Sequence, residues 1–313
     1  MSTAGASSLP IVMVTEGSAA RPLAWLRQHA TVIEASADDP AHAADLAAAA
    51  GLVIRTYTRV NDQLLDRAPS LKVVGRGGVG IDNIDVSACR RRGVEVVYTP
   101  DANTIAVGDF VFGQMLQLIR PWCAFRERAF TPAQFKQMRQ RAGRQLNELT
   151  LGVLGMGRVG RRVGRIAATG FGMRVIYNDL LDVEALLDFA ATAVDKPTLY
   201  REWDMRPGNE NLVGRQQLEW MKPDALLINT SRGEVLDAHA LADAVRTGRL
   251  AGAALDVFAP EPPPADFPLL GMENVLLTPH MASRTHTAME NMSWVVRDVV
   301  AVLQGRSPTH PAP

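Results

Sequence analysis

Arg232, Glu261 and His280 are the side chains whose types and order could do acid–base chemistry on a small organic acid. Each follows a short apolar run, at 225–229, 252–256 and 275–278, of the kind that forms a buried parallel strand. The carboxyl ends of parallel strands meet at one edge of a sheet, so we expect these side chains to share one cleft. An arginine can bind a carboxylate bidentately, a histidine can take or return a hydroxyl proton, and a neighbouring glutamate orients the ring.

Each of these residues also has a plainer interpretation. Arg232 could cap a strand end, Glu261 could be an exposed acid in a proline-rich loop, and His280 could be a structural histidine. Function concentrates in loops at strand ends, which favours the chemical interpretation.

A glycine-rich turn at 155–160 predicts where a dinucleotide binds. It follows the apolar run 149–154 and precedes a helix-forming stretch, the context that this pattern requires. Gly155 would permit the turn, Gly157 would let the backbone approach a pyrophosphate, and Gly160 would let the helix pack on the strand. An acid closes the next apolar run without a following arginine, which favours NAD over NADP. The residues expected to hold the cofactor here are Gly155, Gly157, Arg158, Val159, Gly160 and Asp179.

A second glycine pattern, formed by Gly75, Gly77 and Gly80, has the same spacing but lacks an acid that closes the next apolar run. We interpret residues 75–80 as a loop of exposed backbone amides that could hold an anion. A plain flexible turn is the alternative.

The composition gives little indication of a macromolecular partner. The 313 residues predict about two domains, and the net charge of zero gives no indication of a nucleic-acid or membrane partner. A basic stretch between Arg120 and Arg144 is the local exception and is most simply a solvated face. Cys89 and Cys123 are too few for a disulfide framework, and no metal site is expected. With no signal peptide and no long apolar run, a cytoplasmic location is expected.

Apolar runs alternate with helical stretches along the chain, which predicts an α/β fold with two doubly wound parallel sheets. Residues 103–119 are expected to form a long helix between the domains. Residues 285–304 are expected to form one final helix that returns to the first domain, followed by a frayed tail at 307–313. The expected strands are 11–14, 31–34, 52–55, 72–75 and 94–97 in the first sheet, and 149–154, 173–177, 225–229, 252–256 and 275–278 in the second.

The chain resembles the D-2-hydroxyacid dehydrogenase family, in particular the branch resembling D-3-phosphoglycerate dehydrogenase. The resemblance implies an NAD-binding Rossmann domain (102–284) inserted into a flavodoxin-like substrate domain (1–101), to which a C-terminal helix (285–313) returns. The matching motifs, besides the dinucleotide turn with its acid, are IRTYTRV (54–60), VVGRGGVGIDNID (73–85), NTIAVGD (103–109), MKPDALLINTSRG (221–233), GAALDVF (252–258), the Glu–Pro pair at 261–262 and NVLLTPH (274–280).

The resemblance also implies residue roles. His280 would be the general acid and base, Glu261 its partner and Arg232 the substrate clamp. Thr230 and Asp256 would face the nicotinamide. Family members are usually homodimers, and residues 125–144 match the arm that they use, which gives the basic stretch a second interpretation. The residues implied in substrate binding are Arg76, Gly77, Gly78 and Asn103.

Two departures from the family pattern stand out. Gly108 and Asp109 replace the usual Ala and Glu. Residues 195–211, DKPTLYREWDMRPGNEN, stand where the family has an apolar fourth strand, and the segment is shorter by about eight residues, the length of one strand. Residues 202–205 could form a stub of that strand, the sheet could be rerouted, or the cofactor site could be impaired. We expect weaker NAD binding than in an intact relative.

The leading hypothesis is an NAD-dependent oxidoreductase that acts on a small, anionic D-2-hydroxy or 2-oxo acid. Arg55, Arg59 and Arg76 would suit an anionic tail such as phosphate, although solvated surface arginines are an equal alternative. Oxidation of formate or phosphite stays open within the fold. The competing hypothesis is a dinucleotide-sensing corepressor or a catalytically impaired binding protein of the same fold.

Overall fold

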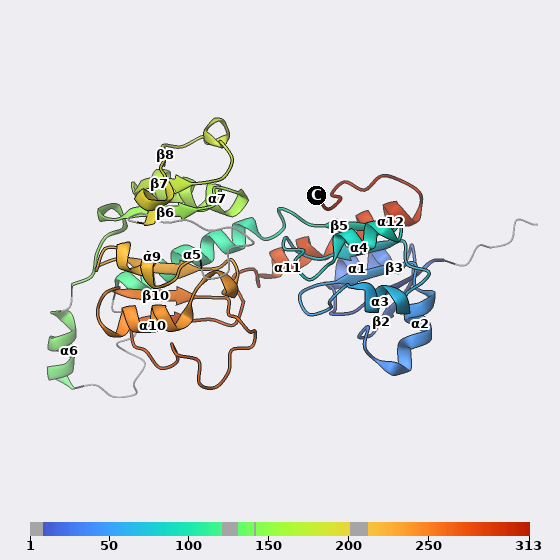
Figure 1. The fold of residues 1–313 in the computed structure, drawn as a ribbon, viewed down its shortest axis with the longest axis horizontal. Coiled ribbons are helices and arrows are strands. Elements are labelled where there is room, and N and C mark those ends of the chain that lie inside the picture. Colours follow the sequence, from blue (N-terminus) through green and yellow to red (C-terminus); the bar gives the residue numbers. More distant parts are fainter. Residues whose placement is uncertain (1–8, 121–130, 141, 201–211) are drawn as a thin grey trace, which may run out of the picture. The chain divides into compact units, whose positions relative to one another are not determined.

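A computed structural model describes residues 9–120, 131–140, 142–200 and 212–313. The chain divides into two compact units, Met1–Asn103 with Arg284–Pro313, and Thr104–Ser283 (Figure 1). The second unit is therefore inserted into the sequence of the first. Within the described residues, no helix combines the length and the apolar character that a membrane span needs.

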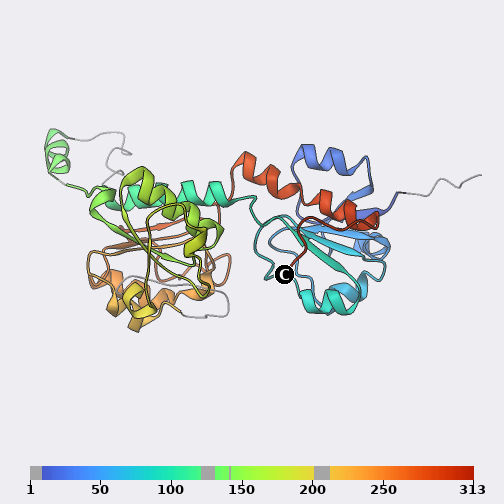
Figure 2. The same cartoon turned by 90° about the horizontal axis from the view of Figure 1, so that it is seen from above.

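The first unit contains a five-stranded parallel sheet in the order β2-β1-β3-β4-β5, a flavodoxin-like order. Helices cover both faces, as Figure 2 shows. Val12 and Val14 of β1 pack with α1 and α12, whereas Met13 packs with α2, α3 and α4 on the other face. Both faces are apolar because both are covered. The elements are β1 Ile11–Val14, α1 Ala20–Leu26, β2 Thr31–Glu34, α2 Ala43–Ala48, β3 Gly51–Ile54, α3 Asp62–Arg67, β4 Val73–Arg76, α4 Val86–Arg91, β5 Glu95–Tyr98, α11 His286–Ser293 and α12 Val296–Leu303.

The expected single final helix is two helices, α11 and α12. Ser293 ends α11, and its hydroxyl donates a 2.8 Å hydrogen bond to the carbonyl of Met289 while accepting one from the amide of Ala19. Such bonding of a serine to the preceding turn competes with the helical pattern and bends helices. Val299 of α12 then packs on the sheet so closely that a Cβ atom on Gly75 would lie 2.4 Å from its Cγ2 atom.

The prediction of a frayed tail at 307–313 is wrong. The tail pairs with β5, because the amide of Ala312 donates to the carbonyl of Val96 at 2.7 Å and the amide of Tyr98 donates to His310 at 3.1 Å. The buried carboxylate of Asp298 accepts hydrogen bonds from the amides of Thr309 and His310. The polar and proline-rich composition of the tail gives no sign of these long-range partners.

The second unit contains two three-stranded parallel sheets, β6-β7-β8 and β9-β10-β11. Within the described part of the chain, no strand pairs with β6 and β9 between the two sheets, where the family's fourth strand was expected. The candidate stub at 202–205 lies outside the described residues. The elements are α5 Thr104–Ile119, α6 Pro132–Arg139, β6 Thr150–Leu154, α7 Arg158–Arg165, β7 Arg174–Asn178, β8 Thr192–Ala193, α8 Lys196–Tyr200, α9 Arg215–Trp220, β9 Leu226–Asn229, α10 Ala238–Arg246, β10 Gly252–Leu255 and β11 Val275–Leu277.

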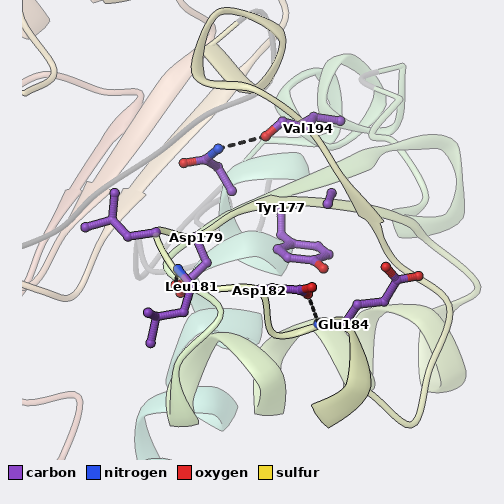
Figure 3. Close-up of a pocket in the computed structure, with 9 residues that line it drawn as sticks. Tyr177, Asp179, Leu181, Asp182, Glu184 and Val194 are labelled. Atoms are coloured by element: carbon purple, nitrogen blue, oxygen red, sulfur yellow. Dashed lines mark hydrogen bonds between the residues drawn. The ribbon is translucent and has the colours of Figure 1, made fainter.

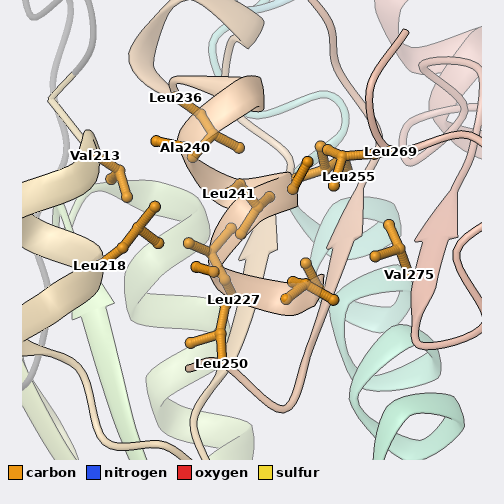
Figure 4. Packing of buried hydrophobic residues seen from close by; sticks show 14 of the residues in the cluster. Val213, Leu218, Leu227, Leu236, Ala240, Leu241, Leu250, Leu255, Leu269 and Val275 are labelled. Carbon is orange, nitrogen blue, oxygen red and sulfur yellow. The ribbon is translucent and has the colours of Figure 1, made fainter. Parts of the chain in front are cut away.

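Apolar packing joins the two sheets. Leu226 and Ile228 of β9 pack against the core cluster that contains β6, β7, α5 and α7. On the other side of β9, Leu218 of α9 and Leu241 of α10 are buried against Leu227 (Figure 4). Burying each leucine contributes about 1.5–3 kcal/mol, so this core stabilises the packing of α9 and α10 against β9.

The unusual Gly108 and Asp109 belong to the contact between α5 and α7. A Cβ atom on Gly108 would lie 2.8 Å from Cγ of Arg162, and the Asp109 carboxylate lies 3.5 Å from the Arg162 guanidinium. The small residue leaves room for the arginine, and the shorter acid pairs with it.

Candidate active site

Three loops leave the carboxyl ends of neighbouring parallel strands in the second unit. Strand β10 lies between β9 and β11, so the chain leaves the sheet at adjacent positions after Asn229, Leu255 and Leu277. These loops carry Arg232, Glu261 and His280. The sheet therefore gathers at one edge the segments that the sequence predicted would meet.

His280 and Glu261 form a hydrogen-bonded pair. The Nδ1 atom of His280 lies 2.8 Å from Oε2 of Glu261, and Oε1 of Glu261 accepts a 3.0 Å hydrogen bond from the amide of Phe258. The two side chains are 37% and 27% exposed, so the pair is fixed and still open to solvent. Within the described residues, Nε2 of His280 makes no hydrogen bond, which leaves that atom for a substrate.

The backbone of His280 is strained. Its φ of +49° is the one positive value among the described residues other than glycine. Such a conformation persists when the surroundings hold it, and it is often found at functional sites. The amide of His280 donates to the carbonyl of Asp256 at 2.8 Å, which holds this turn from the neighbouring strand.

The carboxylate of Asp256 shapes the same turn. Asp256 is 1% exposed and accepts hydrogen bonds from the Thr278 hydroxyl (2.7 Å) and from the amides of Met281 (2.9 Å) and Ala282 (2.8 Å). These contacts differ from the nicotinamide contact that the family resemblance implied for this residue. The direct contact with the cofactor stays a prediction.

The loop that carries Arg232 is held against the loop that carries Glu261. The buried side chain of Asn229 donates to the carbonyl of Arg232 and accepts from the amide and hydroxyl of Ser231. A Cβ atom on Gly233 would lie 1.9 Å from the carbonyl carbon of Phe258. Because the Phe258 amide in turn binds Glu261, the backbone connects the arginine loop to the His280–Glu261 pair.

The dinucleotide turn has the geometry that its glycines predicted. Gly155 adopts a φ of +80°, and a Cβ atom on Gly160 would lie 2.2 Å from the carbonyl oxygen of Gly155. Gly157 caps α7, and a Cβ atom there would meet nothing within 4 Å. The open space at the helix N-terminus fits a pyrophosphate, because the first helical amides and the helix dipole attract anions.

A pocket lies beside this turn, at the carboxyl ends of β7 and β8 (Figure 3). The Asp179 carboxylate accepts hydrogen bonds from the amides of Met156 and Leu181, both at 2.9 Å. Burial, together with the charges of Glu184 and Asp182, raises the pKa of Tyr177 in the pocket wall. The wall is therefore acidic, which fits a ribose hydroxyl and repels a 2′-phosphate. The lining residues are Tyr177, Asn178, Asp179, Leu180, Leu181, Asp182, Glu184, Ala193 and Val194.

The prediction that residues 75–80 form a loop of exposed amides is wrong for Gly77 and Gly78. Gly77 and Gly78 are buried, and their amides donate to the carbonyls of Ile54 and Arg76, both at 2.9 Å. The Arg76 side chain folds back over the loop, because its Nη1 atom donates to the carbonyl of Gly77 and occupies the place of a Cβ atom on Gly78. At Gly77 and Gly78 the structure therefore presents the Arg76 guanidinium and no free amide. The spacing of the glycines could not show this.

Asn103 and Thr230 lie outside these networks. Both residues are half-buried. Asn103 carries a buried Oδ1 atom with no hydrogen-bond partner among the described residues, an acceptor that a substrate hydroxyl could satisfy. The described residues contain no group of three or more His, Cys, Asp or Glu side chains arranged to hold a metal ion.

Sequence reasoning missed the organising role of Asn229. The signal was present, because Asn229 is the polar residue that ends the apolar run 225–229 and is followed by two hydroxyl residues, Thr230 and Ser231. A buried asparagine at such a place must find hydrogen-bond partners, and it finds them in the loop that it supports.

Comparison with known proteins assigns the family. Residues 112–282 match the NAD binding domain of the D-isomer specific 2-hydroxyacid dehydrogenases. The chain is 37% identical to glyoxylate/hydroxypyruvate reductase B of Pectobacterium carotovorum, with 90% of this chain and 91% of the relative covered. The crystal structure of the TT0316 protein from Thermus thermophilus superposes with a TM-score of 0.85 at 32% identity, over 97% of this chain and all of the other.

The chain belongs to the D-isomer specific 2-hydroxyacid dehydrogenase family, and the part that contains the dinucleotide turn is its NAD-binding domain. The D-3-phosphoglycerate dehydrogenase of Methanocaldococcus jannaschii is 35% identical over 81% of this chain, but the match spans about half of that protein's length (50%).

Proposed function

We propose that the protein is an NAD-dependent oxidoreductase that interconverts a small D-2-hydroxy acid and its 2-oxo acid. The observation that carries the proposal is the 2.8 Å contact between His280 and Glu261 at the carboxyl edge of a sheet whose unit also holds the dinucleotide turn. Curated relatives named glyoxylate reductase and glyoxylate/hydroxypyruvate reductase support this reaction class.

The proposed roles follow from the contacts. Glu261 holds the Nδ1–H group of His280, so Nε2 takes the hydroxyl proton during oxidation and returns it during reduction. Arg232 binds the substrate carboxylate. Asp256 positions His280 by shaping its turn. NAD, when bound, accepts or supplies the hydride.

The cofactor and substrate contacts are part of the same proposal. The N-terminus of α7, with Gly157, Arg158 and Val159, would bind the pyrophosphate, and Asp179 would bind the adenosine ribose. Thr230 and Asp256 would lie near the nicotinamide. The substrate contacts would come from the Arg76 guanidinium and from Asn103, because the amides of Gly77 and Gly78 already donate to backbone carbonyls.

We also propose which unit binds the cofactor and which binds the substrate. The unit containing Thr104–Ser283 would bind NAD, and the unit containing Met1–Asn103 and Arg284–Pro313 would bind substrate. We further propose a cytoplasmic homodimer. In the stretch 125–144 expected at the subunit contact, residues 125–130 and 141 lie outside the described residues, and α6 is the described helix.

The test is turnover with a substrate panel. The protein is mixed with NADH and glyoxylate or hydroxypyruvate, or with NAD and D-lactate or D-3-phosphoglycerate, and the absorbance of the reduced cofactor is followed. His280→Ala should lower kcat by about 10²- to 10⁴-fold, since it removes the general acid and base. His239→Ala, which replaces an exposed histidine of α10, is the control.

Two results would contradict the proposal. Unchanged turnover in His280→Ala would remove the assigned mechanism. Tight NAD binding without turnover of any acid in the panel would favour the dinucleotide-sensing alternative.

A further inference from the structure

The tail at 307–313 forms an outer segment beside β5, the last strand in the order of the first unit's sheet. The amide of Ala312 donates to the carbonyl of Val96 at 2.7 Å. The amide of Tyr98, the last residue of β5, donates to the carbonyl of His310 at 3.1 Å. An edge strand presents unpaired amides and carbonyls unless another segment covers it. The tail provides this cover and reaches the carboxyl end of β5.

The carboxylate of Asp298 in α12 holds the start of this pairing. It accepts hydrogen bonds from the amides of Thr309 (2.7 Å) and His310 (3.2 Å), and Nδ1 of the His310 ring lies 3.1 Å from the same carboxylate. Asp298 is buried, so these donors supply the partners that a buried polar group requires. The tail therefore leaves α12 from a fixed point.

The guanidinium of Arg90 in α4 holds the other end of the tail. It donates to the main-chain oxygens of Ala312 (3.0 Å) and Pro313 (2.7 Å). Ala312 is buried in the same apolar cluster as Val96 of β5, whereas Arg90 is exposed. The tail is thus fixed to the first unit at both ends.

Tyr98 connects the tail to Arg76. In the parallel pairing of β4 with β5, Tyr98 lies opposite Arg76. Tyr98 therefore has the tail on one side and the proposed substrate-binding arginine on the other. The next residue, Thr99, donates its amide to the carbonyl of Gly78 at 3.2 Å. The carboxyl end of β5 thus supports the loop at 76–78 from the side that the tail covers.

We propose that the tail positions Arg76 for substrate binding, and that Asp298 and Arg90 are the residues that dock the tail. The docked tail keeps the carboxyl end of β5 from fraying, so the Arg76 side chain stays folded over the loop, where it donates to the carbonyl of Gly77. Asp298 and Arg90 act through β5 and are positioning residues. This inference rests on the proposed function, because it takes Arg76 as a substrate contact.

The test separates binding of the acid from binding of the cofactor. Steady-state kinetics with NADH and glyoxylate or hydroxypyruvate are measured for the wild type, Arg90→Met and Asp298→Asn. The KM for the acid should rise about 2- to 10-fold in both variants, the effect of losing one or two hydrogen bonds that hold the site. A contact made equally in the ground state and the transition state acts on KM, so kcat should change little. The Kd for NADH, whose proposed site lies in the second unit, should stay the same.

Two variants of α4 serve as the matched comparison. Arg90→Lys keeps a charged donor and should return the KM for the acid toward the wild-type value. Arg91→Met removes an exposed arginine of the same helix whose carboxylate contact, with Asp62, is 3.7 Å long. It should leave the KM for the acid unchanged, whereas an equal rise in Arg91→Met and Arg90→Met would overturn the docking role of Arg90.

Amide hydrogen exchange provides a measurement that needs no turnover. In Arg90→Met the amide of Tyr98 should exchange faster, and so should those of Thr99 and Gly77, while Arg91→Met should match the wild type. If no acid turns over but exchange changes in this way, the oxidoreductase assignment fails and the support of the 76–78 loop by the tail stands. If acids turn over while exchange at Thr99 and Gly77 and the KM for the acid match the wild type, the positioning role is refuted and the oxidoreductase assignment stands.

Discussion

Asp256 holds the turn of His280 through its backbone and its side chain together. The Asp256 carbonyl accepts the amide of His280 at 2.8 Å, and the buried carboxylate binds the amides of Met281 and Ala282. The turn that carries His280 is thus held by a residue of the neighbouring strand segment. A positive φ at His280 would otherwise be unfavourable.

Replacing Asp256 by Asn should therefore impair catalysis through position. The amide group keeps the size but cannot accept from all three donors, so one buried donor loses its partner at a cost of about 1–3 kcal/mol in unfolding free energy. We expect a lower kcat with a smaller change in KM for the acid. Steady-state kinetics and urea unfolding measure both effects. Asp266→Asn, an exposed acid of the same unit, is the control; equal behaviour of the two variants would contradict the positioning role.

Substitution of glycine by alanine should affect the stability of the protein differently at two positions of the dinucleotide turn. Gly160→Ala would place a Cβ atom 2.2 Å from the carbonyl oxygen of Gly155, so α7 must move away from β6 and the protein should be destabilised by about 1–3 kcal/mol. Gly157→Ala meets nothing within 4 Å at a φ of −69°, so the free protein should tolerate it.

The discriminating measurement for Gly157→Ala is cofactor affinity. The added methyl group stands where the pyrophosphate would approach, so the Kd for NAD should rise while the Tm of the cofactor-free protein changes little. Calorimetric titration and thermal unfolding of both variants provide the comparison. An unchanged Kd in Gly157→Ala would place the pyrophosphate elsewhere.

Patterns that depend on local chemistry were predicted well from the sequence. The expected strands and the long helix α5 agree with the structure to within about one residue, the usual uncertainty of element ends, whereas the short strand β8 was not expected. The pairing of Glu261 with His280 was also expected, because parallel strands bring their carboxyl ends to one edge. Strand periodicity and glycine spacing carry this information.

Features that depend on distant partners were not predictable in this way. The tail at 307–313 is ordered by Asp298 and β5, and the glycine loop is closed by the Arg76 side chain. No spacing rule identifies either partner from the segment that it orders. The anchoring of Arg232 through Gly233 and Phe258 is of the same kind.

Inserting residues into the shortened segment before β9 should strengthen NAD binding. Leu226 and Ile228 of β9 already pack against the cluster around β6, but no described strand pairs with the facing edges of the two sheets. Inserting an apolar strand of about eight residues after Glu202, which lies outside the described residues, should lower the Kd for NAD about tenfold. A Gly/Ser insert of equal length is the control. If titration with NAD shows no difference between the two inserts, the missing strand does not limit cofactor binding.

The acid stability of the first unit should depend on Glu16. Burial alone would raise the pKa of this carboxyl group, but hydrogen bonds from the amides of Tyr57, Thr58 and Arg55 outweigh it and lower the pKa below 4.5. The stabilisation is therefore complete above about pH 4.5 and is lost as the pH falls through the lowered pKa. Glu16→Gln should cost about 1–3 kcal/mol of unfolding free energy at pH 7. Urea unfolding from pH 7 to pH 3 should show wild type and variant converging in acid, whereas the exposed control Glu95→Gln should follow the wild type throughout. A difference in unfolding free energy between wild type and Glu16→Gln that stays the same at every pH would show that the ionised carboxylate does not hold residues 55–58.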